Sequence, residues 1–232
     1  MLISVSGLIG AGKDTVGNYL INEKGFVKRS FSAALKDVVA AVFHWPRDLL
    51  EGDTIQGREW RDTVDTWWDA KLRSKFNTPI TPRFILQYVG TEVMRNHLDS
   101  NIWVYSIERR LELDKDANII ITDARFLNEL QLVKQNNGHL IRLVRGDDIR
   151  TDFINHFKPY TERAINDYTK ILTKEEILEI EVSVVRSLIA SSPYANLHES
   201  EWQHLLFRDY TSVIFNDSNI ERLETKIQHW LS

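Results

Sequence analysis

The sequence contains no cysteine, which excludes disulfide bonds, thiolate metal sites and cysteine nucleophiles. It also lacks a long apolar run: the N-terminal apolar segment, residues 2–6, is short and has no basic segment before it. Neither a signal peptide nor a membrane-spanning helix is therefore expected. Positive charge is not in excess, because 29 Lys and Arg residues stand against 33 Asp and Glu residues. We expect a cytoplasmic protein with neither a nucleic acid nor a membrane as its partner.

The order of apolar and polar segments predicts an α/β protein. The 232 residues, of which 43% are hydrophobic, suffice for one domain with its own core. Short apolar runs alternate with segments of helical periodicity, which is typical of a parallel sheet covered by helices on both faces. Five strands are expected, at residues 2–6, 26–31, 118–122, 139–144 and 210–215. Helices are expected at residues 14–23, 32–43, 83–98, 102–113 and 126–136, and a last one opens with a capping box at Ser218 and Glu221.

Two segments interrupt this alternation, and we expect both to be largely helical insertions into a single domain of residues 1–232. The first, residues 44–82, is punctuated by prolines and glycines and is rich in tryptophan. The second, residues 145–197, is polar, and Thr173 and Glu176 are spaced within it as a capping box.

A glycine-rich segment follows the first expected strand. It reads Gly7-Leu8-Ile9-Gly10-Ala11-Gly12-Lys13-Asp14-Thr15, which fits the pattern G-x-x-x-x-G-K. Glycines let successive backbone N–H groups turn towards a phosphate, and the helix that follows directs its N-terminal dipole at the same anion. The lysine of such a loop reaches the β- and γ-phosphates of a nucleotide. The alternative is a plain glycine-rich turn, but the motif lies between a strand and a helix, where phosphate binding requires it. The candidate nucleotide-binding residues are Gly7, Gly10, Ala11, Gly12, Lys13, Asp14 and Thr15.

Asp14 departs from the usual form of this motif. The residue after the lysine is usually Ser or Thr, whose hydroxyl ligates Mg²⁺. We hypothesise that the Asp14 carboxylate holds the ion directly or through water, while Thr15 bonds an α-phosphate. The loop alone leaves a GTPase, a motor ATPase and a kinase open, and the guanine-reading motif Asn-Lys-x-Asp does not occur. Two insertions favour a kinase, which must close over two substrates and exclude water.

Further segments give the chain a family resemblance. They are Leu35-Lys36-Asp37, Arg83-x-x-Leu86-Gln87-x-x-Gly90-Thr91-Glu92, Asp123-Ala124-Arg125, His198-x-x-Glu201 and Val213-Ile214-Phe215-Asn216-Asp217. With these segments and the loop, the sequence resembles the phage deoxynucleoside monophosphate kinases, a branch of the adenylate-kinase-like P-loop kinases. The resemblance covers nearly the whole chain, although both insertions match poorly. It implies a P-loop kinase-type three-layer core, the use of ATP and Mg²⁺, and, for a phage protein, action in the host cytoplasm.

The resemblance implies roles for polar residues that follow the expected strands. Asp123 lies at the carboxyl edge of the sheet and can hold Mg²⁺ opposite the loop, or else cap the next helix. Arg125 can bind the acceptor phosphate as a fork, or else form a surface ion pair. Arg145 opens the second insertion and can stabilise the transferring phosphoryl group. Asn216 can contact the donor adenine, or else form a turn. The expected catalytic residues are thus Lys13, Asp123, Arg125 and Arg145, and the expected metal ligands are Asp14 and Asp123.

Acceptor binding is expected in and beside the first insertion, residues 44–82. Arg83, Gln87 and Thr91 are spaced four residues apart, so they share one face of the expected helix. Arg83 can hold the acceptor phosphate and Gln87 can read a base edge, although a solvated helix face is the alternative. Basic side chains offer further phosphate contacts: Lys36, Arg58 and Arg61. Four aromatic rings can stack on the base or form a local core: Trp45, Trp60, Trp67 and Trp68.

We therefore expect an enzyme that transfers the γ-phosphoryl group of ATP to the 5′-phosphate of a deoxynucleoside monophosphate. Two alternatives stay open. One is a kinase of another small phosphorylated metabolite, such as dephospho-coenzyme A or phosphomevalonate. The other is a nucleotide-dependent switch that hydrolyses ATP slowly without an acceptor. The sequence leaves open the accepted base and sugar, the acting lid arginine and a possible homodimer.

Overall fold

The computed structural model describes residues 1–165 and 172–231, and the chain divides into two compact units. One unit comprises residues Met1–Lys28 with Ala117–Ser232, and the other comprises Arg29–Asp116. Part of the expected second insertion, residues 166–171, lies outside the described residues. No helix in the described ranges is long and apolar enough to cross a membrane.

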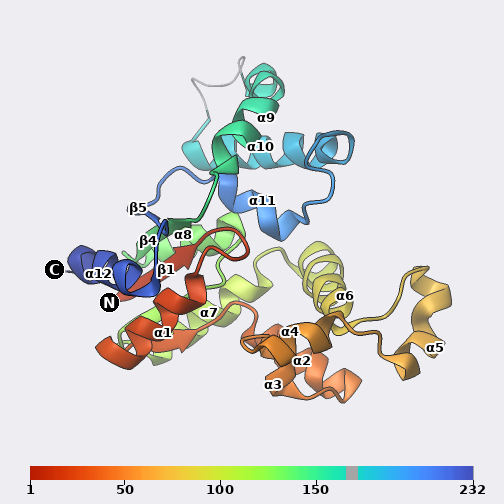
Figure 1. Cartoon of the computed structure of the whole chain (residues 1–232). Coiled ribbons are helices and arrows are strands. Elements are labelled where there is room, and N and C mark those ends of the chain that lie inside the picture. Colours follow the sequence, from red (N-terminus) through yellow and green to blue (C-terminus); the bar gives the residue numbers. More distant parts are fainter. Residues whose placement is uncertain (166–171, 232) are drawn as a thin grey trace. The chain divides into compact units, whose positions relative to one another are not determined.

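A five-stranded sheet lies at the centre of the first unit (Figure 1). Its strand order is β2-β3-β1-β4-β5, with β1 at Leu2–Ser6, β2 at Val27–Arg29, β3 at Ile119–Ile121, β4 at His139–Val144 and β5 at Ser212–Phe215. β1 pairs in parallel with both β3 and β4, and β4 pairs in parallel with β5. In the register of these pairs, Ile3 lies opposite Ile120 and His139. The predicted parallel sheet is confirmed, with β2, β3 and β5 shorter than expected.

Helices cover this sheet in the way that the apolar patterns require. α1 (Lys13–Lys24) and α12 (Ile220–Leu231) contact each other and share one buried core with alternate residues of the strands, which include Ile3, Val5, Ile120, Ile141, Leu143 and Ile214. α8 (Leu127–Gln135) contacts β1 and β4 and buries a separate set of side chains, Leu127, Leu130 and Val133 among them. The α/β class and the three-layer core with a parallel sheet are therefore confirmed.

Helices also follow β4 in the first unit, as the sequence predicts for residues 145–197. They are α9 (Ile149–Ile165), α10 (Lys174–Leu188), the short 3₁₀ turn η2 (Ile189–Ser191) and α11 (Glu199–Leu206), and α10 contacts both α9 and α11. The predicted capping box is present, because Thr173 N–H donates to the Glu176 carboxylate at 2.7 Å and Glu176 N–H donates to the Thr173 hydroxyl at 3.2 Å.

The capping box expected at Ser218 and Glu221 is wrong. α12 begins one residue later than that box requires, and the Asn219 side-chain oxygen accepts a hydrogen bond from Arg222 N–H at 3.0 Å. The Ser218 hydroxyl donates instead to Asp217 at 3.3 Å. Asparagine is as favourable a helix cap as serine. The sequence therefore offers two adjacent caps, and the structure uses Asn219.

The second unit is helical. It contains α2 (Ala33–Phe43), α3 (Arg47–Glu51), α4 (Ile55–Asp62), α5 (Thr66–Phe76), α6 (Pro82–Gln87), the π-helix η1 (Tyr88–Leu98) and α7 (Ile102–Leu113). The helical expectation for residues 44–82 is confirmed. Trp45, Trp60 and Trp68 pack into its core with Leu50 and Ile80, whereas Trp67 is 60% exposed. Three of the four tryptophans therefore form the local core that was one of the two expectations.

The helix expected over residues 83–98 is present, but only its first part is α-helical. The α-helix ends at Gln87 and continues as a π-helix, whose i→i+5 bonding adds residues to each turn. The three residues spaced four apart differ in exposure: Arg83 is half-buried, Gln87 is exposed and Thr91 is only 6% exposed. Tertiary contacts accompany the change, since Trp103 Nε1 donates to the Gly90 carbonyl at 3.0 Å.

Candidate active site

The glycine-rich loop connects β1 to α1 at the carboxyl edge of the parallel sheet, where α/β proteins bind ligands. Two glycines make its path possible. A Cβ on Gly7 would lie 2.3 Å from the Leu143 carbonyl oxygen of the neighbouring strand. Gly12 has φ of +100°, in the region that favours glycine, and a Cβ there would lie 2.7 Å from Asn216 Nδ2. The loop therefore fits closely against β4 and the end of β5.

Lys13 lies across the loop that precedes it. Its Nζ donates hydrogen bonds to the Gly7 carbonyl at 2.9 Å and to the Leu8 carbonyl at 3.0 Å. Burial, and next the neighbouring Arg125 guanidinium, lower the pKa of Lys13 to about 8. Three carboxylates oppose this shift: Asp14, Asp123 and Glu201. The structure thus brings three other predicted residues within electrostatic reach of the Lys13 ammonium: Asp14, Asp123 and Arg125.

The segment after β3 holds two of these residues. Glu129 caps α8, because its carboxylate accepts hydrogen bonds from Arg125 N–H at 2.7 Å and from Phe126 N–H at 3.1 Å. Glu129 is thus a carboxylate that caps this helix end. Asp123 and Arg125 are both half-buried beside the loop lysine.

Carboxylates beside Lys13 suit a hard cation. Across residues 1–165 and 172–231, no three His, Asp or Glu side chains form a group that can hold a metal by themselves. Mg²⁺ seldom needs such a group, since it usually takes one or two carboxylates together with substrate phosphates and water. The exposed Asp14 and the half-buried Asp123 meet that requirement in number and in chemistry.

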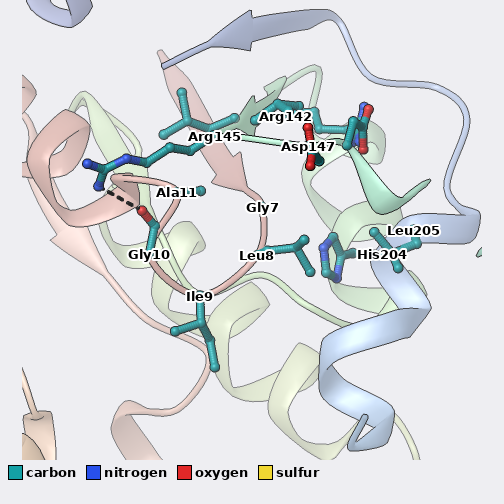
Figure 2. Close-up of a pocket in the computed structure, with 13 residues that line it drawn as sticks. Gly7, Leu8, Ile9, Gly10, Ala11, Arg142, Arg145, Asp147, His204 and Leu205 are labelled. Atoms are coloured by element: carbon teal, nitrogen blue, oxygen red, sulfur yellow. Dashed lines mark hydrogen bonds and ion pairs between the residues drawn. The ribbon is translucent and has the colours of Figure 1, made fainter. Parts of the chain in front are cut away.

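A cavity of about 250 Å³ lies beside the loop (Figure 2). The loop itself lines it from Gly7 to Ala11. The end of β4 and the segment after it contribute Arg142 to Arg145, Asp147 and Asp148, and α11 contributes His204 and Leu205. Arg145 Nη1 donates to the Gly10 carbonyl at 3.3 Å, so this predicted catalytic arginine reaches the loop. Arg142 forms an ion pair with Asp148.

Asn216 braces the loop. Its Nδ2 donates to the Ala11 carbonyl at 2.9 Å, and its backbone N–H donates to the Val144 carbonyl at 2.7 Å. The sequence placed this residue at the nucleotide, and its side chain lies against the nucleotide-binding loop. Ala11 is buried, Thr15 is half-buried, and both belong to the same loop and first helical turn.

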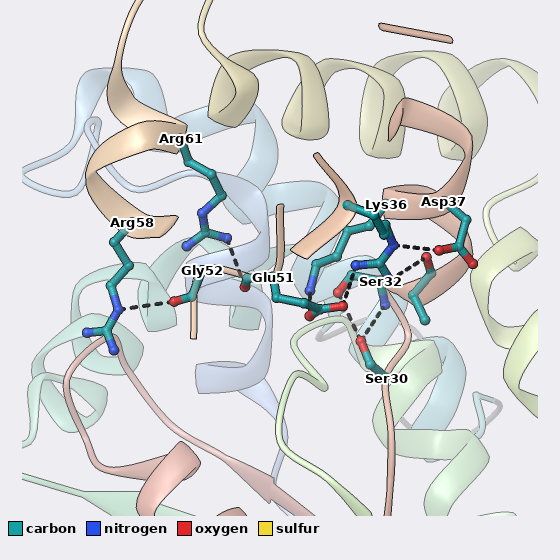
Figure 3. Close-up of polar contacts among 10 residues, drawn as sticks. Ser30, Ser32, Lys36, Asp37, Glu51, Gly52, Arg58 and Arg61 are labelled. Atoms are coloured by element: carbon teal, nitrogen blue, oxygen red, sulfur yellow. Dashed lines mark hydrogen bonds and ion pairs between the residues drawn. The ribbon is translucent and has the colours of Figure 1, made fainter. Parts of the chain in front are cut away.

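Three basic residues predicted for the acceptor gather at one turn of the second unit (Figure 3). Lys36 Nζ donates to Glu51 Oε2 at 2.6 Å, and Arg61 Nη1 donates to the Glu51 carbonyl at 3.4 Å. Arg58 donates to the Gly52 carbonyl at 3.1 Å and to the Asp53 carbonyl at 3.0 Å. These cations surround the turn between α3 and α4, while Arg83 forms an ion pair with Asp62 on α4.

The sequence assigned no role to α11, which the structure brings to the site. His198 caps this helix, since its Nδ1 accepts from Ser200 N–H at 3.2 Å. The negative charge of Glu201 acts to raise the pKa of Lys13, and His204 lines the cavity. The segment His198-x-x-Glu201 was the available signal, but its spacing alone does not say which element it faces.

A glycine-rich loop with its lysine, at the carboxyl edge of a five-stranded parallel sheet, defines a phosphate-binding protein of the P-loop class. The family described as "Deoxynucleotide monophosphate kinase" matches residues 56–180. A protein of Acanthamoeba polyphaga mimivirus, named "Putative deoxynucleotide monophosphate kinase", is 30% identical over 208 residues, which cover 84% of this chain and 100% of that protein. The chain belongs to the deoxynucleotide monophosphate kinase family.

Other comparisons are shorter or weaker. The "Deoxynucleoside-5'-monophosphate kinase" of Escherichia phage T5 is 40% identical over 58 residues, which are 25% of this chain and 23% of that protein. The crystal structure of a sugar kinase from Janibacter sp. HTCC2649 is 15% identical and has a TM-score of 0.39, with 99% of this chain and 92% of that chain covered.

Proposed function

We propose that the protein transfers the γ-phosphoryl group of ATP to the 5′-phosphate of a deoxynucleoside monophosphate, giving the diphosphate and ADP. The observation that carries this proposal is Lys13, whose ammonium lies across the carbonyls of a phosphate-binding loop in a member of this kinase family. An oxygen of the acceptor phosphate attacks the γ-phosphorus, and the bond from that phosphorus to the bridging β-phosphate oxygen breaks. The acceptor is already an anion, so no side-chain nucleophile is required.

Catalysis in this proposal is positional and electrostatic. Lys13 leaves its loop carbonyls to neutralise the β- and γ-phosphates, and Arg145, which reaches Gly10 of the same loop, neutralises the transferring group. Arg125 lies beside Lys13 and binds the acceptor phosphate as a planar fork. Each role requires a cation within reach of the loop, and all three residues belong to the first unit.

Asp14 and Asp123 are the proposed residues that hold Mg²⁺. When bound, this ion neutralises charge on the β- and γ-phosphates. Asp14→Asn is expected to raise the Mg²⁺ concentration needed for half-maximal activity, because an amide is a weaker ligand for a hard cation than a carboxylate. Asp37→Asn, an exposed carboxylate of the second unit, is the matched control. An unchanged Mg²⁺ titration removes Asp14 from the proposed metal site.

We assign acceptor binding to residues 44–82 with Lys36, Arg58, Arg61, Arg83, Gln87 and Thr91, and a lid role to residues 145–197. Lys36 and Arg83 are supported least, because Glu51 and Asp62 already neutralise them. Arg58 is supported better, since its hydrogen bonds to the Gly52 and Asp53 carbonyls do not neutralise its positive charge. For Arg58→Ala we accordingly expect a raised KM for the monophosphate and an unchanged KM for ATP.

The deciding experiment is a coupled assay of ADP release with ATP and Mg²⁺, run with each deoxynucleoside and ribonucleoside monophosphate. The expected result is release that depends on one or more monophosphates and disappears in Lys13→Ala. Release without any acceptor would favour the switch ATPase. No ADP release with any monophosphate, despite ATP binding, would favour a kinase of another phosphorylated metabolite such as dephospho-coenzyme A. The viral sources of both relatives support action in the host cytoplasm. That the protein forms a homodimer is a separate prediction.

A further inference from the structure

His204 is a buried polar side chain that faces the cavity beside the loop. Its exposed fraction is 3%, and neither ring nitrogen has a hydrogen-bond partner among the residues that the structure describes. Figure 2 shows the ring on α11 next to the Leu8 side chain of the loop. A buried polar group without a partner destabilises a folded protein, so such a group requires an explanation.

Cations surround this ring. Lys13, Arg125, Arg142 and Arg150 all act on His204 electrostatically. Burial, reinforced by these four charges, lowers the pKa of His204 to about 3, so the ring is neutral at physiological pH. A neutral imidazole carries one N–H donor, and the other nitrogen is an acceptor.

The acidic groups nearby are fewer and mostly engaged. Asp148 forms an ion pair with Arg142, Glu201 lies near Lys13, and Asp147 lines the cavity. The Tyr210 hydroxyl donates to the His204 backbone carbonyl at 3.0 Å and leaves the imidazole ring free of that contact. The ring thus offers a neutral donor inside a positively charged pocket, an arrangement that suits an anionic ligand.

We propose that His204 donates a hydrogen bond from its ring to an oxygen of the γ-phosphoryl group of bound ATP, and this assignment rests on the proposed function. The ring shares its cavity with residues 7–11 and lies within electrostatic reach of Lys13. The loop lysine of this motif generally reaches the β- and γ-phosphates, which favours the γ-phosphoryl group as the partner of the ring. Because the ring nitrogens are closed off from solvent beside Leu8, the contact forms when the glycine-containing loop shifts around the phosphates. His204 is then a substrate-binding residue that senses the group to be transferred.

The proposal predicts a distinction between ATP and ADP. His204→Phe keeps an aromatic ring but removes the donor, so its affinity for ATP should fall roughly 10- to 100-fold, as expected for a lost hydrogen bond to a charged group. Its affinity for ADP should change less than about 2-fold, because ADP lacks the γ-phosphoryl group. His204→Gln retains an N–H donor and should recover most of the affinity for ATP. His156→Phe, at an exposed histidine of α9, is the matched control.

Calorimetric titration of each variant with ATP and with ADP, without acceptor, tests this. Equal affinity of His204→Phe and wild type for ATP would overturn the proposal, and so would an equal loss for both nucleotides. The wild-type protein provides a second readout: the ring ¹⁵N resonances of His204 should move with a non-hydrolysable ATP analogue and not with ADP. If His204→Phe does not fold, this spectrum decides alone, and unmoved resonances overturn the inference. A wild type without monophosphate-dependent ADP release would refute the proposed function, whereas an active wild type with an unchanged His204→Phe refutes only the role of His204.

Discussion

Replacing Lys13 with methionine should lower activity and raise stability. The Lys13 ammonium is held by two loop carbonyls, and burial, with Arg125, lowers its pKa from 10.5 to about 8. At 1.36 kcal/mol per pKa unit, carrying this charge in the folded state costs at most about 3 kcal/mol. The side chain keeps some contact with water, and its removal leaves two carbonyls without this donor. We therefore expect Lys13→Met to be only about 1 kcal/mol more stable than wild type at pH 7.

The pH dependence gives the sign of this effect independently. Below pH 8 the folded and the unfolded protein both hold the Lys13 proton, so the cost of the buried charge is fully present. Between about pH 8 and 10.5 the unfolded chain still holds that proton, whereas the folded protein has released it. Stability rises with pH wherever the unfolded state binds more protons, so wild type should gain on Lys13→Met across this window.

Urea unfolding at pH 7 and pH 10 measures the stability difference, and the coupled assay measures activity. Lys24→Met, an exposed lysine on the same helix, is the control and should show neither effect. ADP release by Lys13→Met should fall on the order of 100-fold or more, because at least one hydrogen bond between charged groups is lost. A variant that is less stable than wild type by the same amount at both pH values would refute the buried-charge reasoning. Unchanged ADP release would refute the role of Lys13 in phosphoryl transfer.

Three further changes test other parts of the structure. Gly12→Ala places a Cβ at φ of +100° and 2.7 Å from Asn216 Nδ2. The variant should lose about 1–3 kcal/mol of stability in urea unfolding and bind ATP more weakly. A variant as stable as wild type would contradict this loop geometry. Arg208→Met removes both hydrogen bonds to the Glu181 carboxylate, whose side chain is 8% exposed, and should cost about 3 kcal/mol of unfolding free energy. A second change, Glu181→Met, should partly restore this stability, because it removes the unpaired buried charge. No recovery in the double variant would mean that packing, not charge, dominates. Although burial acts to raise the pKa of Glu51, hydrogen bonds from two basic side chains lower it below 4.5, so the stability it contributes is present above that pH and lost as pH falls through the lowered pKa. Glu51→Gln should reduce this acid-induced loss when melting temperature is followed from about pH 6 to pH 3, and an unchanged slope would exclude the group.

Local signals in the sequence located most of the elements. The boundaries of β4 and α7 agree with prediction, and the phosphate loop was identified with its lysine, because each depends on residues that are close together along the chain. The errors are also local in origin. The cap of α12 was misplaced by one residue, because Ser218 and Asn219 are both good capping residues. The π-helical part from Tyr88 was not predicted, because a shift in hydrogen bonding leaves no mark in a short apolar pattern.

Sequence alone determined the class of chemistry in this protein: a glycine-rich loop and its lysine, placed between a strand and a helix, specify phosphate binding through local backbone geometry. Only the tertiary structure decided which distant groups join that loop. Asn216 reaches Ala11 across 205 positions of sequence, and α11 carries Glu201 and His204 to the same site. Such approaches depend on the strand order of the sheet, which brings the end of β5 and the helices after β4 to the loop that follows β1. The spacing of residues along the chain does not encode these distances. The ring of His204 is a candidate phosphate-binding group only because it is buried and has no hydrogen-bond partner among the residues that the structure describes.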